Sequence, residues 1–166
     1  MRTLLLCLVG IALTIQSFDA TAQVNLGAGY FHGTDQAEGG FSANAQFFID
    51  KNLVFAPEML FFMRSHFEPD NGFQDWFELN LNLQHMFHTK HIKPYWFVGI
   101  NFAYVNYQRE EFDMSETKVY PALNAGVGFN VDIGKRLMPY GEARLVGLNE
   151  TDGLIFGGGL RWKLKE

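Results

Sequence analysis

The chain alternates between apolar and polar positions with a period of two residues. The clearest case is residues 76–87, where the apolar series Phe77, Leu79, Leu81 and Leu83 alternates with the polar series Glu78, Asn80, Asn82 and Gln84. Successive side chains of a β-strand point to opposite faces, so this pattern predicts a strand with one apolar and one polar face.

The same alternation recurs along most of the chain. It is strong over residues 96–105, 123–131 and 154–164, and weaker over residues 24–31, 41–49, 53–63 and 138–148. Together with residues 76–87, these segments predict eight strands, and no segment has a convincing helical period.

The connections between the predicted strands are alternately short and long. Short ones lie at 50–52, 88–93 and 132–137, and longer or more polar ones at 33–40, 65–75, 108–117 and 149–153. Short turns on one rim and long loops on the other are typical of up-and-down barrels of the bacterial outer membrane, in which the short turns face the periplasm.

The N-terminal segment has the features of a secretory signal. Arg2 precedes an apolar stretch over residues 4–15, and Ala20-Thr21-Ala22 fits the small-x-small cleavage rule. We predict a signal peptide over 1–22 and a mature barrel domain over 23–166. Removing 22 of the 166 residues leaves 144, or 18 for each of eight strands with its connection, and removes Cys7, the single cysteine.

The polar face of the predicted strands is expected to line the barrel interior. Polar groups that share a narrow lumen pair with one another, which offsets the cost of removing them from water. The predicted lumen network is Glu58, Arg64, Glu78, Asn80, Asn82, Gln84, Glu142, Arg144 and Arg161.

The opposite face is nearly free of charge and is expected to meet lipid, because Lys or Arg at the bilayer midplane costs about 2–4 kcal/mol. The predicted lipid-facing residues are Phe77, Leu79, Leu81, Leu83, Val98, Ile100, Phe102, Leu123, Val127, Phe129 and Leu160. Amphipathic aromatics near strand ends are predicted to lie at the membrane interfaces: Tyr30, Trp76, Trp96, Tyr104, Tyr120 and Trp162. Alternation alone also fits a soluble barrel that carries a small apolar ligand, so that alternative stays open.

Composition and charge exclude other classes. Mean hydropathy is −0.05 and no apolar run approaches the roughly 20 residues of a membrane-spanning helix, which argues against a helical membrane protein. The formal charge of −5 argues against nucleic acid as a partner, since such binding depends mainly on Lys and Arg.

Three segments of the mature chain carry a family resemblance: Lys93–Tyr104, Met138–Leu145 and Phe156–Trp162. With the strand pattern, they resemble the small eight-stranded outer-membrane barrels of the OmpA and OmpX type, within the broad Bacteroidetes-like group of outer membrane β-barrel or porin-family proteins. The resemblance implies outer-membrane lipids, lipopolysaccharide and the barrel-insertion machinery as partners. Such barrels usually end on an aromatic residue, whereas here Trp162 is followed by four further residues.

Few residues suggest chemistry. The predicted outer loops are acidic and could hold Ca²⁺ or Mg²⁺ on their carboxylates, although they lack the spacing of a calcium loop. His88 and His91 share a predicted turn without the further ligands that zinc needs. Ser65, His66 and Ser115 could form part of a hydrolase site only if the loops brought them together.

These observations predict an all-β, eight-stranded antiparallel transmembrane barrel in the outer membrane of a Gram-negative bacterium. The expected role is non-enzymatic, either membrane-structural or in surface interaction. We expect no cofactor, catalytic residue or metal site. A soluble carrier and a lipid-A-modifying barrel enzyme are the alternatives.

Overall fold

All regular structure in the described residues is β-strand. The computed structural model describes residues 23–34, 39–63, 65–67, 72–109, 114–147 and 153–164, so the predicted signal peptide and Arg64 lie outside it. The strands are β1 (Val24–Gly33), β2 (Gly39–Phe48), β3 (Leu53–Phe62), β4 (Ser65–Phe67), β5 (Gly72–Met86), β6 (Ile92–Arg109), β7 (Met114–Val131), β8 (Leu137–Gly147) and β9 (Gly153–Lys163). Within these ranges, no helix has the length and apolarity needed to cross a membrane.

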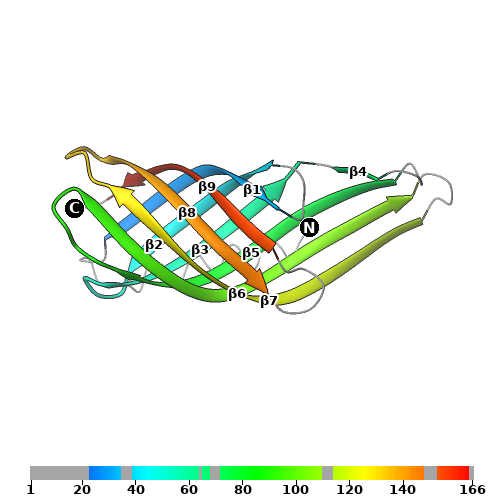
Figure 1. Cartoon of the computed structure of the whole chain (residues 1–166), viewed down its shortest axis with the longest axis horizontal. Coiled ribbons are helices and arrows are strands. Elements are labelled where there is room, and N and C mark those ends of the chain that lie inside the picture. Colours follow the sequence, from blue (N-terminus) through cyan, green and yellow to red (C-terminus); the bar gives the residue numbers. More distant parts are fainter. Residues whose placement is uncertain are drawn as a thin grey trace.

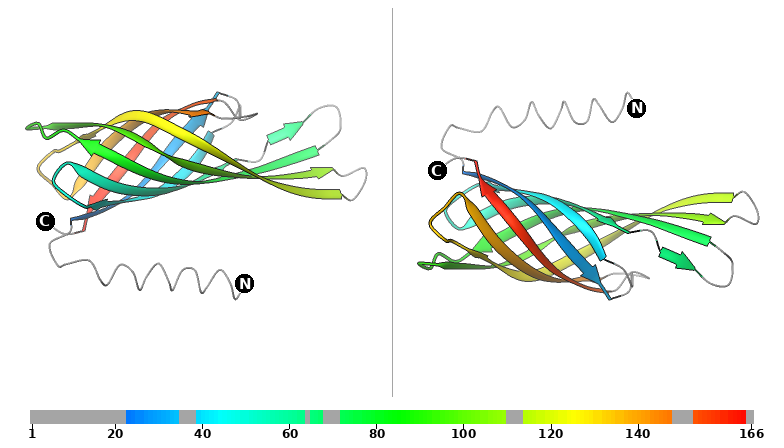
Figure 2. Two further views of the ribbon diagram at one scale, coloured as in Figure 1. Left: turned by 90° about the horizontal axis from the view of Figure 1, so that it is seen from below. Right: turned by 90° about the horizontal axis from the view of Figure 1, so that it is seen from above.

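The strands form a closed antiparallel barrel. Their order is β3-β2-β1-β9-β8-β7-β6-β5-β4, and β3 also pairs with β5, which closes the ring around eight strands. The three-residue β4 pairs with β5 beyond the end of β3. Figure 1 and Figure 2 show the strands steeply tilted around the barrel axis. The predicted eight-stranded up-and-down barrel is therefore confirmed.

Three of the strands are much longer than the others. β6 and β7 have 18 residues each and β5 has 15, whereas β1, β2 and β3 have 10 each. About 9–11 tilted residues suffice to cross a bilayer, so these three strands continue beyond the wall. They project from the end of the barrel in Figure 1. We call this projection the blade: β4, residues 72–76 of β5, 105–109 of β6 and 114–118 of β7.

Apolar side chains also occupy parts of the barrel interior. At the blade end, a buried cluster includes Phe31, Leu60 and Ile155. At the turn end, a second cluster contains Val54, Met86, Tyr95 and Phe97. The interior is thus mixed, with apolar clusters at both ends of a polar middle layer. The sequence analysis had assigned only polar residues to it.

Glycine allows close packing where β9 meets β1. Gly159 lies opposite Gly29 in the strand register, and a side chain there would overlap the carbonyl group of Ala28. The overlap would be with backbone atoms, which cannot rotate away as a side chain can. Gly159 is therefore required for the tight curvature of this small barrel.

Candidate functional site

The centre of the barrel contains a buried cluster of charges from opposite walls. Arg144 of β8 forms ion pairs with Glu58 of β3 and, at 2.6 Å, with Glu142. β3 and β8 lie diametrically opposite each other in the ring of eight strands, so the pair between Arg144 and Glu58 spans the lumen. The Arg144 guanidinium also lies 5.3 Å from the ring centre of Phe31 and 5.6 Å from that of Phe97.

A second arginine links four other strands. Arg161 of β9 donates hydrogen bonds to Asn44 Oδ1 at 3.1 Å, Tyr95 Oη at 3.0 Å and Asn130 Oδ1 at 2.6 Å. Its guanidinium lies over the Tyr140 ring, 3.8 Å from the ring centre. Sequence reasoning placed Arg161 inside but missed Tyr95, which occurs among other aromatics, and Tyr140, although Tyr140 shares the alternation of Glu142 and Arg144.

Amides continue the polar layer between the charged residues. The Asn101 amide donates to Glu78 Oε2 at 2.8 Å and to Asn80 Oδ1 at 2.9 Å, and Asn124 donates to the same Asn80 oxygen at 2.6 Å. Toward the turns, Gln46 donates to Gln84 at 2.8 Å. These side chains are almost fully buried, as is Asn82, which is 2% exposed.

The polar layer therefore fills the lumen. Bulky arginine and tyrosine side chains cross it, and both arginines are at most 2% exposed. An eight-stranded barrel has an interior just wide enough for such side chains. Among the described residues, this packing supports the wall from within.

The predicted lipid-facing residues lie on the outer wall. Leu81, Leu83, Val98, Ile100, Leu123, Val127, Phe129 and Leu160 are 37–62% exposed. Phe77, Leu79 and Phe102 are half-buried. Other large apolar residues on this wall include Leu26, Met59 and Leu145.

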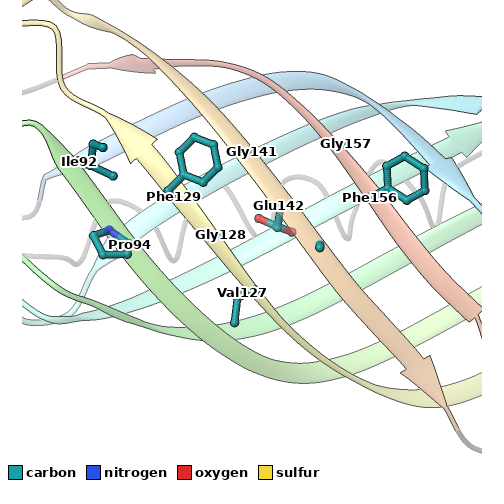
Figure 3. A pocket seen from close by; sticks show the side chains of 10 residues that line it. Ile92, Pro94, Val127, Gly128, Phe129, Gly141, Glu142, Phe156 and Gly157 are labelled. Carbon is teal, nitrogen blue, oxygen red and sulfur yellow. The ribbon is translucent and has the colours of Figure 1, made fainter.

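The outer wall has a shallow apolar depression over β8 (Figure 3). Its volume is about 710 Å³, and its sides include Val127, Phe129 and Phe156. The floor is low because Gly141 has no side chain. Glu142 also borders the depression, but its carboxylate is bonded inside the barrel to Arg144 and Tyr95. The depression thus presents mainly apolar surface, which suits contact with hydrocarbon.

The predicted interfacial aromatics divide between the two faces. Tyr30, Trp96, Tyr104 and Trp162 are outward and 39–48% exposed. Trp76 and Tyr120 instead share the inner-facing alternation of Glu78 and Asn124, so the prediction of interfacial positions is wrong for these two. The Trp76 indole N–H donates to Glu78 Oε1 at 2.9 Å, and its ring packs on the buried cluster at the blade end.

An aromatic row that the sequence analysis missed crosses five neighbouring strands. Tyr30, Phe41, Phe61, Phe77 and Tyr104 lie opposite one another in register from β1 to β6. Ring centres are 5.6 Å apart for Tyr30 and Phe41, 4.9 Å for Phe61 and Phe77, and 5.7 Å for Phe77 and Tyr104. Only the strand register shows that these residues are neighbours.

The turn rim is held by an ionic cluster. Asp132 accepts hydrogen bonds from Lys93 at 2.8 Å and from Lys163 at 3.0 Å. Lys93 lies on β6 and Lys163 on β9, two strands that do not follow each other in the sequence. The hydrogen bond from the Lys93 ammonium group, and to a lesser extent that from Lys163, holds the pKa of Asp132 well below its ordinary value. Asp132 also accepts from the Gly134 amide in the turn, where Gly134 has a φ of 71°.

The backbone positions of the residues considered for a hydrolase site are not neighbours in the strand register. In register, His66 lies opposite Phe73, Phe73 opposite Gln108, and Gln108 opposite Ser115. Three strand spacings, roughly 14 Å, thus separate the backbones of His66 and Ser115. Among the described residues no cluster of three or more His, Cys, Asp or Glu could hold a metal. Most acidic residues of the predicted outer loops lie outside the described ranges.

Comparison with solved structures identifies the fold. The N-terminal barrel domain of Pseudomonas aeruginosa OprF matches with a TM-score of 0.70 at 12% identity, covering 86% of this chain and 97% of that one. Ail of Yersinia pestis, in complex with the heparin analogue sucrose octasulfate, matches with a TM-score of 0.63 at 13% identity, covering 85% and 99%. Neisserial surface protein A matches with a TM-score of 0.61 at 15% identity, covering 86% and 96%.

The fold is that of the small eight-stranded outer-membrane barrels. No family model matches the chain. No curated protein matches it either. De novo designed transmembrane β-barrels match with a TM-score of 0.59, so this fold alone does not specify a biological role.

Proposed function

We propose that the protein is a non-enzymatic outer-membrane barrel that presents the blade as a surface for interaction outside the cell. The fold of its structural neighbours supports an outer-membrane location, and so does a wall of exposed apolar side chains around a buried polar layer. A soluble carrier of apolar ligands would need the reverse arrangement, with the apolar face inside. The filled lumen favours an anchor over a channel.

The observation that carries the proposal is the open edge of β7. β7 pairs with β6 from Met114 to Val131, but with β8 only from Leu123 to Asn130. Residues 114–122 therefore have no paired strand on the β8 side among the described residues. An extended strand with unpaired backbone groups is a template for the addition of another strand.

The chemistry of the blade indicates the kind of partner. Backbone hydrogen bonds along the edge would bind an extended polypeptide, while the exposed side chains of Thr117, Lys118 and Val119 would set selectivity. Pro121 limits pairing to one end of the edge because it has no backbone N–H. Ail was solved with a sulfated heparin analogue, but the acidic residues of the predicted outer loops here disfavour such a polyanion.

Site-specific photo-crosslinking on intact cells tests the proposal. A benzoylphenylalanine residue at Val119 or Thr117 should form adducts with polypeptide. The same group at Val127, on the outer wall, should form none with polypeptide because it faces hydrocarbon. Absence of polypeptide adducts from both blade positions, with the barrel folded and displayed, would contradict an interaction role for the blade.

A further inference from the structure

Four asparagine side chains line one side of the barrel interior. Asn80 and Asn82 lie on β5, Asn101 on β6 and Asn124 on β7. In the strand register, Asn80 lies opposite Asn101, and Gly99 lies between Asn82 and Asn124. All four asparagines are at most 3% exposed. We call these four side chains the amide cluster.

The Glu78 carboxylate fixes the orientation of three of these amides. An ionised carboxylate only accepts hydrogen bonds, so the Asn101 atom that lies 2.8 Å from Glu78 Oε2 is the amide nitrogen. The same nitrogen donates to Asn80 Oδ1 at 2.9 Å. Because Asn80 presents its oxygen there, Asn124 also contacts it through nitrogen, at 2.6 Å. The oxygens of Asn101 and Asn124 therefore take no part in these three bonds.

Three amide oxygens of the cluster consequently have no donor. Asn82 Oδ1, Asn101 Oδ1 and Asn124 Oδ1 are buried, and within the described ranges no group donates a hydrogen bond to them. Two of them gather over Gly99, where an added Cβ would overlap both Asn82 Oδ1 and Asn124 Oδ1. Buried acceptors that have lost their hydration cost free energy unless a donor or a cation lies among them.

The charge balance of the polar layer favours a cation. In the part of the chain that the structure describes, this layer holds three buried carboxylates and two buried guanidinium groups, those of Glu58, Glu78, Glu142, Arg144 and Arg161. Both arginines pair with the other two carboxylates, whereas Glu78 forms no ion pair with a described residue. The two donors to Glu78 are neutral, an indole and an amide. The buried Lys163 belongs to the turn rim, where it pairs with Asp132. One negative charge beside the amide cluster is therefore in excess.

We propose that the amide cluster binds one alkali cation. Asn82 and Asn124 are its ligands over Gly99, Asn101 offers the next oxygen, and Glu78 supplies the compensating charge. Hard cations take oxygen ligands, and neutral carbonyl oxygens replace the hydration shell of a monovalent ion. A divalent ion would leave the layer with excess positive charge. The Asn80 amide N–H groups also have no acceptor among the described side chains, which suits a water molecule that the cation retains.

The cation site lies inside the closed barrel and does not use the blade. A cation held there would join β5, β6 and β7 below the point where they leave the wall, and would make the stability of the barrel depend on the alkali ion. Photo-adducts at the blade neither support nor contradict this site, so the two proposals stand or fall separately.

Urea unfolding of the mature protein in phosphatidylcholine vesicles tests the proposal. Sodium chloride would replace N-methylglucamine chloride at constant ionic strength, so that general screening of charges stays the same, and EDTA would remove divalent ions. If the folded protein binds one sodium ion, its folding equilibrium constant should rise by up to about tenfold for each tenfold increase in sodium. The unfolding transition would move to higher urea concentration.

Variants of the cluster locate the ion. Asn82→Ala and Asn124→Ala should each abolish the rise with sodium, and Glu78→Gln should weaken it. Gln46→Ala is the matched control, because the oxygen and the nitrogen of this buried amide both have protein partners. It should lower stability and keep the sodium dependence of the parent.

Two results would overturn the proposal. Unfolding of the parent that does not depend on sodium would mean that a proton on Glu78, or water alone, satisfies the cluster. Equal sodium dependence in the parent, Asn82→Ala and Asn124→Ala would place the ion elsewhere on the protein.

Discussion

The parts of β5, β6 and β7 that lie in the barrel wall and the parts that lie in the blade have the same alternating pattern but different surroundings. Inside the closed barrel, the inner-facing Glu78, Asn80 and Asn101 are at most 1% exposed. In the blade, the residues that continue this inner-facing series are less buried. Trp76 of β5 is only partly buried, and Lys118 of β7 is exposed. An inner face therefore exists only where the ring of strands is closed, and the alternation by itself does not create one.

The two regions also differ in what stabilises them. The barrel has a ladder partner on both sides of each of its eight strands and a buried polar layer across its centre. Among the described residues, the blade is an open sheet with unpaired edges at β4 and β7 and no opposite wall, so its stability rests mainly on its backbone ladder. We expect the blade to open locally at a lower free energy than the barrel.

The largest expected effect comes from removing the interior cation. Arg144→Ala leaves the buried Glu58 and Glu142 carboxylates without their shared partner, and breaking a buried ion pair in this way costs about 3–5 kcal/mol. Urea unfolding in lipid vesicles, followed by heat-modifiable gel migration, measures this loss. The blade substitution Lys118→Ala should cost less than about 1 kcal/mol. Equal losses for the two variants would refute the contrast between interior and blade.

A smaller effect is expected from charge on the outer wall. Leu81→Arg places a cation in the apolar band, at a cost of about 2–4 kcal/mol if it lies near the midplane, and should impair membrane assembly. Thr117→Arg, the same new residue on an outward position of the blade, should assemble normally, as should the interior variant Asn82→Ala. The measurement is the folded fraction recovered in the membrane. Efficient assembly of Leu81→Arg would show that this face does not meet lipid.

The smallest effect is expected at the turn rim, which resembles neither region. Because Lys93 and Lys163 lower the pKa of Asp132 in the folded protein, Asp132 stabilises the fold above its ordinary pKa of 3.8. That contribution is lost as pH falls below this value and the carboxylate is protonated. Asp132→Asn should cost less than about 1 kcal/mol at neutral pH, since the group is partly exposed. Unfolding of the variant should depend less on acid than that of the parent, and identical acid profiles would argue against the cluster.

Much of the wall was predictable because adjacent residues of a β-strand point to opposite faces, so the sequence of each strand shows which residues share a face. Leu79 and Leu81 beside Glu78 and Asn80 identify a two-faced strand without knowledge of its neighbours. The fold class, the number of barrel strands and the alternation of short and long connections follow from such local patterns.

The candidate sites were less predictable because they depend on register. Phe41, Phe61 and Tyr104 are far apart in the chain, and only the pairing of β2, β3, β5 and β6 makes them one row. The interior position of Trp76 was missed although it follows from the alternation with Glu78, since the residue was assigned by its proximity to a strand end.

The sequence by itself determined that the strands have two faces, because side-chain alternation is a property of each extended segment. It also determined that consecutive strands are antiparallel, because short connections join them. Tertiary structure alone decided that β5, β6 and β7 extend beyond their neighbours and that Arg144 meets Glu58 across the lumen. Those features depend on which residues of distant segments come into register and on where the ring closes, and a local pattern carries no information about either.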